Sequence, residues 1–561
     1  MIIAVAALLL APALLLAQVV PRGARSAGTS AAITTADLRA RVSIIADDTT
    51  LGRETGSAGD DAAARYVAAE FRRLGLAPGG EHGTFFQQVP LVRHVYDPQS
   101  AIRVDGGPPI ASADFAVLHP ALNLPAGTAR PFEGAQAVYG GIDGDTTYQI
   151  GAAEANGRVV VLAAPIGADG VRHARSRADE IHPRLLGAAA IAFVTLDITP
   201  AEYLESWRQP ALILRGDPVW ARPMPSYLVI SPQMAHALLG VAVDGARLGQ
   251  LGRTVRGSVG FVEQPLERPT RNVVAILRGR SPGMRGEYVS ISAHHDHIGS
   301  THTPVEHDSV HAFMRAYERF RQASPERRVS GEQERSIRVN VDSLRRRARP
   351  RADSIFNGAD DDASGIAAQL EIAESLVHGA RRPARSILFI AHTAEERGLL
   401  GSRWFADHPT IELDSLVAEL DMDMVGRGSA SDLDGGGSDY LELIGSRRRS
   451  TELGDLIDRV NGWPAHRFRI NYAYDAPGHP EQDWCRADHY SYARHGIPVA
   501  AFSTSYHGDY HQVTDEAQYL DYPHMARIAA FVRDVALTIA ELDRRPLLDK
   551  PRPDPDAPCR Q

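Results

Sequence analysis

The sequence has few cysteines, no excess of basic charge and, after its first 20 residues, no long apolar run. Cys485 and Cys559 are its only cysteines, so it lacks a disulfide framework and a CxxC zinc knuckle, and whether the two pair stays open. The formal net charge is -9 without a basic stripe, so we expect no nucleic-acid partner. No later segment reaches the roughly 18 apolar residues of a membrane span. A chain of 561 residues is long for one core, so we expect two or more globular domains.

The amino terminus is the only strongly apolar segment. It reads MIIAVAALLLAPALLLAQVV and is followed by Arg22 and Arg25. Its apolar run is short for a bilayer span, and small residues near Ala17 and Ala27 supply candidate cleavage sites. We interpret residues 1–27 as a signal peptide and expect a secreted or periplasmic protein with no other membrane segment. Because a positively charged start is missing, an uncleaved anchor is the alternative.

Hydrophobic patterns divide the remaining chain. Residues 28–125 contain an amphipathic helix pattern that stops at Gly75, and residues 126–264 alternate short apolar runs with Gly and Pro turns, which indicates an inserted strand-rich domain. From residue 265 to 545 strand and helix patterns alternate. This alternation predicts an α/β three-layer sandwich, with a mostly parallel central sheet flanked by helices. The expected strands are Asn272–Leu277, Tyr288–Ala293, Ser386–Ala391, Leu416–Asp423, Tyr440–Ile444 and Ile497–Ser503, and the expected helices are Ser364–Val377 and Met525–Leu542.

Two segments depart from this pattern. Residues 302–355 are dense in charge, with weak helical periodicity, and we interpret them as a solvated helical insertion; a flap that faces the substrate is the alternative. Residues 546–561 are polar and proline-rich, and we expect them to be a disordered tail.

Metal-ligand residue types recur at five places, each at an expected strand end or turn. Two histidines and three carboxylates suit zinc, and one shared carboxylate would make a pair of ions about 3.5 to 4 Å apart. The five candidates are His294 in SAHHDHIG, Asp361 in NGADDDASG, Glu396 in TAEERG, Asp423 in ELDMDMVGRG and His511 in YHGDYHQVTD.

This order of His-x-Asp, Asp-x-x-Ser-Gly, Glu-Glu, Asp-Met and a late His resembles the di-zinc aminopeptidase family of leucyl aminopeptidases, glutamate carboxypeptidases and glutaminyl cyclases. The resemblance covers about residues 272–542 and implies two zinc ions per chain. It places His294 and Asp423 on one ion and Glu396 and His511 on the other. Asp361, three residues before Ser364, would bridge them in preference to Asp360 or Asp362.

The resemblance also assigns catalytic roles to two acids. Asp296 would orient the His294 imidazole. Glu395 would be the general base that takes a proton from a water between the ions and passes it to the leaving amine. If strand geometry continues past His294, both His295 and His297 point to the opposite face and are not ligands.

Further residues and one domain match the family less specifically. Asp488 and His489 in RADHYSY resemble its Ser-Asp-His turn, which lines the pocket or supports the ligands, and Tyr510 is a candidate substrate contact. Residues 126–264 resemble a protease-associated domain in their runs GRVVVLAAP, HPRLLGAAAIAFVTLD and MPSYLVISPQMAHALLG. Such a domain would be either a substrate-filtering wall or a passive insert.

The resemblance implies a secreted zinc aminopeptidase that acts on peptides. A carboxypeptidase, with Arg447–Arg449 as possible carboxylate partners, and a glutaminyl cyclase are alternatives within the family. A non-catalytic binding protein is a remote alternative, because the glutamate pair and the late histidine are all present. The sequence does not disclose the oligomeric state.

Overall fold

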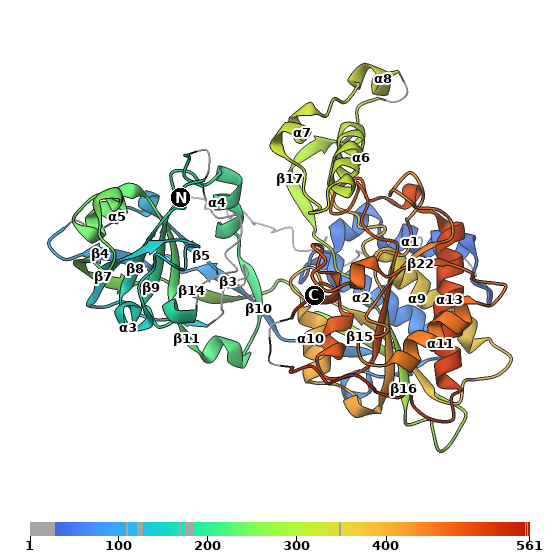
Figure 1. The fold of residues 1–561 in the computed structure, drawn as a ribbon. Helices are drawn as coiled ribbons and strands as arrows, with labels where there is room; N and C mark the ends of the chain where they lie inside the picture. The colour runs from blue at the N-terminus through green and yellow to red at the C-terminus, as the bar shows by residue number, and fades with distance from the viewer. Residues whose placement is uncertain are drawn as a thin grey trace, which may run out of the picture. The chain divides into compact units, whose positions relative to one another are not determined.

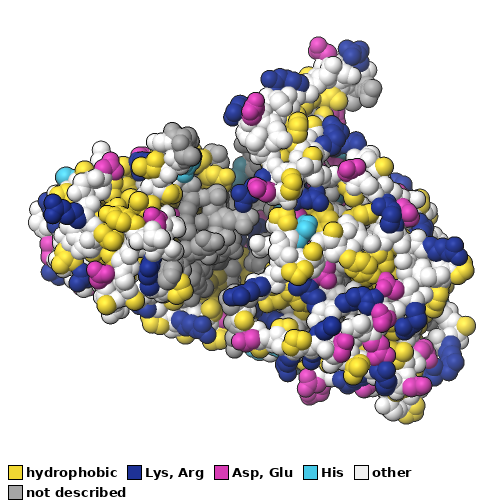
Figure 2. Space-filling model, viewed as in Figure 1, with side chains coloured by type: hydrophobic (Ala, Val, Ile, Leu, Met, Phe, Trp, Pro, Cys, Tyr) yellow, Lys and Arg dark blue, Asp and Glu magenta, His cyan; other side chains and the backbone are white. Residues whose placement is uncertain are grey.

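The computed structural model describes residues 29–107, 110–119, 127–167, 170–173, 183–346, 349–555, 557 and 559–561. The expected signal peptide, residues 1–27, lies outside them. The chain forms two compact units (Figure 1). Unit 1 combines the residues up to Val89 with those from Glu267 onward, and unit 2 runs from Pro90 to Leu266. On the face shown in Figure 2, acidic and basic side chains are interspersed. In the described part of the chain, no helix is both long enough and apolar enough to cross a membrane.

Unit 1 is built on a nine-stranded sheet of order β1-β15-β19-β16-β20-β23-β21-β22, with β2 also paired to β15. The central strands β19, β16, β20 and β23 run parallel to one another, whereas β15 and β21 are antiparallel to their inner neighbours. The sheet is therefore mixed, and parallel at its centre. Its strands are β1 Ala77–Pro78, β2 Phe86–Val89, β15 Thr270–Leu277, β16 Tyr288–His294, β19 Ser386–His392, β20 Leu416–Met422, β21 Tyr440–Ile444, β22 Arg469–Asn471 and β23 Val499–Ser503.

Side-chain alternation along these strands produces three layers. Val273 and Ala275 of β15 join a core with α1, α2, α9, α11 and α13, whereas Val274 and Ile276 join a second core with α10 and α12. Successive strand residues point to opposite faces, so each apolar strand needs helices on both sides. The helices are α1 Thr35–Ile45, α2 Ala58–Arg73, α9 Ala363–Val377, α10 Leu400–Asp407, α11 Thr451–Asn461, α12 His489–Ala493 and α13 Tyr522–Ala540.

Unit 2 contains a seven-stranded sheet of order β4-β13-β7-β8-β9-β12-β5, a three-stranded sheet β10-β3-β14 and the pair β11-β6. It begins at Pro90, not at the expected residue 126, because β3, β4 and β5 pair with strands of the insert. The strands are β3 Leu91–Tyr96, β4 Ala101–Val104, β5 Phe115–Leu118, β6 Thr128–Ala129, β7 Ala135–Ile142, β8 Val159–Ala163, β9 Ala190–Val194, β10 Ala211–Leu214, β11 Pro223–Met224, β12 Ser226–Ile230, β13 Leu251–Ser258 and β14 Phe261–Pro265, and the helices are α3 Ala152–Ala155, α4 Ala201–Arg208 and α5 Pro232–Leu239.

The charged insertion has regular structure. Strands β17 and β18 pair antiparallel at its base, and α6, α7 and α8 lie between them in sequence. Its helix α6 contacts the rest of unit 1, because Gln322 donates to the Asp432 carbonyl and Arg321 pairs with Glu481. The insertion is therefore not surrounded by solvent alone. The elements are β17 Ser300–Glu306, α6 His307–Ala323, α7 Gly331–Ser336, α8 Val341–Arg345 and β18 Ala352–Ile355.

The described residues of the carboxyl-terminal tail are attached to unit 1. A disulfide joins Cys485 to Cys559, which answers the question that the sequence left open. The Trp484 backbone N–H donates to Gln561 Oε1 at 3.0 Å, and the Gln561 amide donates to the Tyr474 carbonyl at 2.8 Å. The expectation of disorder was wrong because composition reports only how much apolar surface a segment can bury. The disulfide and the hydrogen bonds of Gln561 hold this polar segment instead.

Candidate metal centre

The candidate ligands come from neighbouring strand ends of unit 1. His294 is the last residue of β16, Glu395 and Glu396 follow β19, and Asp423 follows β20. These three strands are parallel neighbours, so their carboxyl ends meet at one edge of the sheet. Asp361 lies just before α9, and the segment between β23 and α13 carries His511. The structure therefore brings together all five residues that the sequence indicated.

Asp361 lies between two histidines. Its Oδ1 is 3.0 Å from His294 Nε2, and its Oδ2 is 3.0 Å from His511 Nε2. The adjacent aspartates have further partners of their own. Asp360 faces His507 at 3.1 Å, and Asp362 accepts the backbone N–H groups of residues 294, 365 and 424. This arrangement favours Asp361 as the shared ligand.

Each histidine has its own carboxylate partner besides Asp361. His294 Nε2 is 3.7 Å from Asp423 Oδ1, and His511 Nε2 is 3.0 Å from Glu396 Oε2. We call the His294 and Asp423 side the buried half of the centre, and the Glu396 and His511 side the loop half. His294 and Asp423 belong, with Asp362, to one group whose ligand atoms all lie within 4.8 Å of one another, and Glu396 and His511 belong, with Asp361 and His297, to another.

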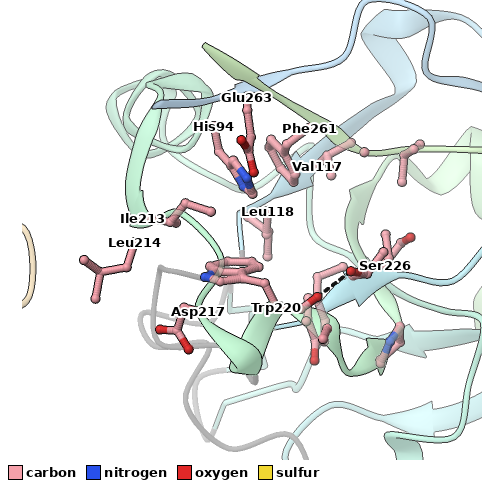
Figure 3. A pocket seen from close by; sticks show the side chains of 18 of the residues that line it. His94, Val117, Leu118, Ile213, Leu214, Asp217, Trp220, Ser226, Phe261 and Glu263 are labelled. Carbon is pink, nitrogen blue, oxygen red and sulfur yellow. Dashed lines mark hydrogen bonds between the residues drawn. The ribbon is translucent and has the colours of Figure 1, made fainter. Parts of the chain in front are cut away.

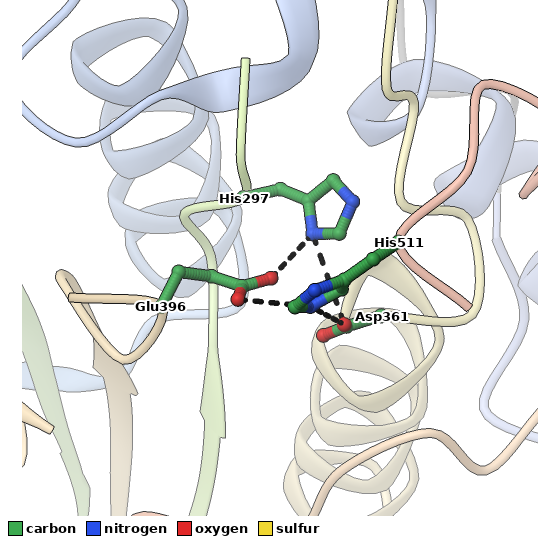
Figure 4. A group of neighbouring side chains, drawn as sticks. All are labelled: His297, Asp361, Glu396 and His511. Atoms are coloured by element: carbon green, nitrogen blue, oxygen red, sulfur yellow. Dashed lines mark ion pairs between the residues drawn. The ribbon is translucent and has the colours of Figure 1, made fainter. Parts of the chain in front are cut away.

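His297 joins the loop half, as Figure 4 shows. Its Nδ1 is 2.7 Å from Glu396 Oε1 and 3.9 Å from Asp361 Oδ2. The expectation that His297 points away was wrong, because β16 ends at His294 and strand alternation stops there. His295 does turn elsewhere, with its Nδ1 3.1 Å from Asp60 Oδ1. The polar run His-His-Asp-His after an apolar strand was the available signal that the strand ends.

The polar atoms at the centre fit a cation better than they fit one another. Five buried ligand atoms have no hydrogen bond of acceptable geometry, although they face one another closely. Buried polar atoms left unpaired cost about 1–3 kcal/mol each, so the metal-free arrangement is unfavourable. Imidazole nitrogens and carboxylate oxygens are ligands that zinc accepts. The five atoms are His294 Nε2, His297 Nδ1, His511 Nε2, Glu396 Oε1 and Asp423 Oδ1.

The carboxyl groups differ in their affinity for protons. Burial and Asp361 raise the pKa of Glu396, but nearby His511 and His297 outweigh them and lower it to about 2. Burial raises the pKa of Asp423 to about 6. Burial also raises the pKa of Glu395 well above its ordinary value, and the charges of Glu396 and Asp423 add to the shift. Glu395 is therefore the acid of the adjacent pair that is more ready to hold a proton.

Asp296 connects the buried half to Glu395. Its Oδ1 accepts the Glu395 backbone N–H at 3.1 Å, and its Oδ2 accepts the Thr55 hydroxyl at 2.8 Å. His294 Nδ1 lies 3.1 Å from the Asp296 carbonyl oxygen and 3.6 Å from its carboxylate. Asp296 thus touches both the candidate ligand and the loop of the candidate base.

Comparison with known proteins identifies the segment that carries this centre. Residues 272–536 match Peptidase family M28. This segment belongs to peptidase family M28. All five candidate ligands, together with Asp296, His297 and Glu395, lie within the M28 segment.

Two curated relatives match parts of the chain. A probable zinc metalloprotease of Pyrenophora tritici-repentis is 41% identical over 75 residues, which cover 13% of this chain and 17% of that protein. A probable leucine aminopeptidase 2 of Aspergillus oryzae is 30% identical over 156 residues, 27% of this chain and 28% of that protein. The matched stretches therefore span less than one third of the relatives' own lengths.

Solved structures of aminopeptidases resemble the chain at low sequence identity. Among them, the aminopeptidase from Aneurinibacillus sp. strain AM-1 is 17% identical, and the likeness covers 92% of this chain and 97% of that chain with a TM-score of 0.47.

A pocket opens beside the centre of the M28 segment. Asp361, Glu395, Asp423 and Tyr510 line it, together with Arg486 and residues of β21 and β23. Tyr510 also stacks on the His511 ring with the centroids 3.9 Å apart. The expected contact residue Tyr510 thus lies in the pocket.

Asp488 and His489 lie close to this region without lining the pocket. Both are almost fully buried. The His489 backbone N–H donates to Asp421 Oδ2 at 3.2 Å, and its ring Nδ1 is 3.6 Å from the same oxygen. Their environment favours a supporting role over contact with the substrate.

Unit 2 has its own cavity of about 500 Å³ (Figure 3). His94, Trp220, Phe261 and Glu263 line it, and His94 Nδ1 is 3.2 Å from His119 Nε2. None of the residues that the sequence indicated lies in this cavity. Among the described residues, each group that could hold a metal lies outside unit 2.

Proposed function

We propose that this protein is a zinc-dependent exopeptidase, an aminopeptidase that hydrolyses the amino-terminal peptide bond and holds two zinc ions per chain. The observation that carries the proposal is the position of Asp361, with one oxygen 3.0 Å from His294 and the other 3.0 Å from His511. A carboxylate that faces two imidazoles in this way suits two adjacent metal ions, and Glu395 remains beside them as an acid outside both ligand groups.

In this proposal, one ion is held by His294, Asp361 and Asp423, and the other by Asp361, Glu396 and His511. Zinc ions bound here would lower the pKa of water and polarise the carbonyl of the peptide bond. The His297 imidazole hydrogen-bonds Glu396 or adds a nitrogen ligand to the second site. In this arrangement Asp361 is the ligand that the buried half and the loop half share.

Glu395 is the group that moves protons. Its Oε2 is 3.9 Å from His294 Nε2, close to the centre, and its carboxyl lines the pocket. The raised pKa suits a base that takes a proton from the attacking water and returns it to the leaving amine. Asp296 keeps this side chain in place through the Glu395 backbone N–H.

The substrates proposed are peptides with a free amino terminus. The name of the Aspergillus oryzae relative supports an aminopeptidase. A carboxypeptidase is the second candidate, because Arg486 lines the pocket and a guanidinium can hold a terminal carboxylate. Arg447 and Arg448 do not favour it, since they pair with Asp455 and Asp475 and lie outside the pocket lining.

Matched peptides with free or blocked termini test the proposal. Purified protein should cleave peptides with a free amino terminus, lose this activity to a chelator and regain it with zinc. Metal analysis should find two zinc ions per chain. Cleavage that requires a free carboxyl terminus would instead identify a carboxypeptidase, and no cleavage by protein with two bound zinc ions would refute both candidates.

Two further proposals concern the rest of the chain. We propose that the protein is secreted or periplasmic, on the sequence pattern of residues 1–27. We also propose that unit 2 corresponds to a protease-associated domain, supported by its strand-rich composition and by its insertion between two parts of unit 1.

A further inference from the structure

The far end of the pocket beside the metal centre is acidic, although no metal group includes it. Glu442 of β21 and Asp483 line this end together with Ser503 and Ser505. Both carboxylates are more than nine-tenths buried. Asp483 Oδ2 has no hydrogen-bond partner, whereas its Oδ1 accepts the Tyr506 hydroxyl at 2.6 Å. A ligand bound in the pocket can therefore donate a hydrogen bond to this unpaired oxygen of Asp483.

Among the described residues, neither Glu442 nor Asp483 forms an ion pair with a basic side chain, although the charge of Arg486 lowers the pKa of Asp483 and that of Arg327 lowers the pKa of Glu442. Arg486 lines the same pocket with its side chain 45% exposed, and it donates to the Glu481 carbonyl at 3.4 Å and to the Tyr510 hydroxyl at 3.3 Å. Burial raises the pKa of Asp483 to about 6 and that of Glu442 well above its ordinary value, so Asp483 is the acid of the two that is mostly ionised at mildly alkaline pH.

Strand order gives the distance from the centre to this acidic end. Asp423 follows β20, β20 pairs with β23, and β23 pairs with β21. Glu442 stands opposite Ser503 across the last of these pairs. Two strand spacings amount to about 10 Å. A residue bound with its carbonyl at the metals would therefore direct its side chain, and not its α-amine, toward Glu442.

The tail supports one wall of this pocket. Asp483 begins a short 3-10 helix, Asp483–Cys485, whose last residue forms the disulfide with Cys559. The Trp484 backbone N–H donates to Gln561 in the same turn. The disulfide and the hydrogen bond hold this short segment in position, so the carboxylate is preorganised and does not need to be drawn in by a ligand.

We propose that this pocket selects peptides whose amino-terminal residue is lysine or arginine, with Glu442 and Asp483 holding the cationic end of that side chain. The inference rests on the proposed aminopeptidase function, because the pocket receives the first side chain only if the bond after it is cleaved. A cationic side chain bound there would supply the hydrogen-bond donors that the two carboxylates lack. The carboxylates in turn would replace the water that the cation loses on burial.

Norleucine is the matched probe, because its side chain resembles that of lysine without the ammonium. At pH 8 with zinc, we expect kcat/KM for lysine and arginine 4-nitroanilides to exceed that for norleucine 4-nitroanilide by about 30-fold or more. Glu442→Gln and Asp483→Asn should each reduce the ratio of lysine to norleucine kcat/KM by about tenfold or more. Glu419→Gln, which alters a buried carboxylate of β20 outside the pocket lining, should leave the ratio unchanged.

Three results would overturn the inference. A wild-type preference for norleucine or leucine would show that the pocket is not used for cations. An equal loss of lysine and norleucine turnover in both pocket variants would show that the acids serve the α-amine or the fold. A ratio that stays at the wild-type value in both variants would exclude these two groups. If no nitroanilide is cleaved by zinc-loaded protein, the proposed aminopeptidase function fails first.

Discussion

The two halves of the candidate metal centre are built in different ways. His294 ends a central strand, and its side chain is 2% exposed. His511 lies in the segment after β23, where its side chain is 33% exposed. Its backbone φ of 55° lies in the left-handed region, which a non-glycine residue adopts only when its surroundings hold it there. The sheet thus positions the buried half, whereas the loop half needs support from outside the sheet.

Part of that support comes from the charged insertion. His311 of α6 hydrogen-bonds Asp509, two residues before His511, with Nδ1 2.6 Å from Oδ1. A Cβ on Gly508 would lie 2.9 Å from the Cα of Arg315, so only glycine lets α6 approach this closely. Asp509 also accepts Arg427 Nη2 at 3.0 Å. A helix of the insertion, 198 residues before Asp509 in sequence at His311, therefore braces the segment of one proposed ligand.

Removing the group that the two halves share should have the largest effect. Asp361→Ala takes away the carboxylate that faces both histidines, so both sites should lose zinc. We expect turnover to fall by more than the roughly 10–100-fold that losing a partner of a ligand costs. Metal analysis after dialysis measures the loss, and Asp342→Ala, on an exposed part of α8, is the control. Two tightly held ions in Asp361→Ala would disprove the shared role.

Changing the base should separate chemistry from metal binding. Glu395→Gln keeps the shape of the side chain and removes its ability to take a proton, so kcat should fall by about 10²–10⁴-fold. Zinc content should stay at the wild-type level, because Glu395 belongs to neither ligand group. Turnover and metal analysis on the same sample check both statements. Wild-type turnover in this variant would remove Glu395 from the role of base.

His297→Ala should weaken only the loop half. Its Nδ1 lies 2.7 Å from Glu396 and 3.9 Å from Asp361, whereas Asp423 belongs to the other ligand group. We expect one of the two zinc affinities to fall by about 10–100-fold and the other to stay close to wild type. A competition titration with a zinc chelator resolves the two sites. An equal loss at both would mean that the halves are not independent.

His311→Ala should have the smallest effect and sharpens the comparison most. It removes the hydrogen bond to Asp509 without touching a ligand, so the zinc affinity of the loop half should fall by about tenfold. Arg319→Ala on the exposed side of the same helix is the matched control. The same titration measures both variants. If His311→Ala leaves both affinities unchanged, α6 does not position the loop half.

Much of unit 1 could be predicted because its signals are local. Strand and helix patterns such as Tyr440–Ile444 were placed at their observed bounds, since apolar periodicity directly reflects burial. The ligands at strand ends followed from the same logic. The antiparallel edge strands, the start of unit 2 at Pro90 and the approach of His297 could not be predicted in this way. Each depends on which segment lies next to another, and strand pairing is a non-local choice.

By itself, the sequence determined the residue types of the metal centre, their order and the central strands that present them. Ligand chemistry and alternating hydrophobicity are both local properties of the sequence. Only the tertiary structure decided that His297 lies beside Glu396, that α6 braces Asp509, and that Glu442 and Asp483 meet in one pocket. Those contacts join residues up to hundreds of positions apart. Their geometry arises only when strands and insertions pack, and no local pattern encodes it.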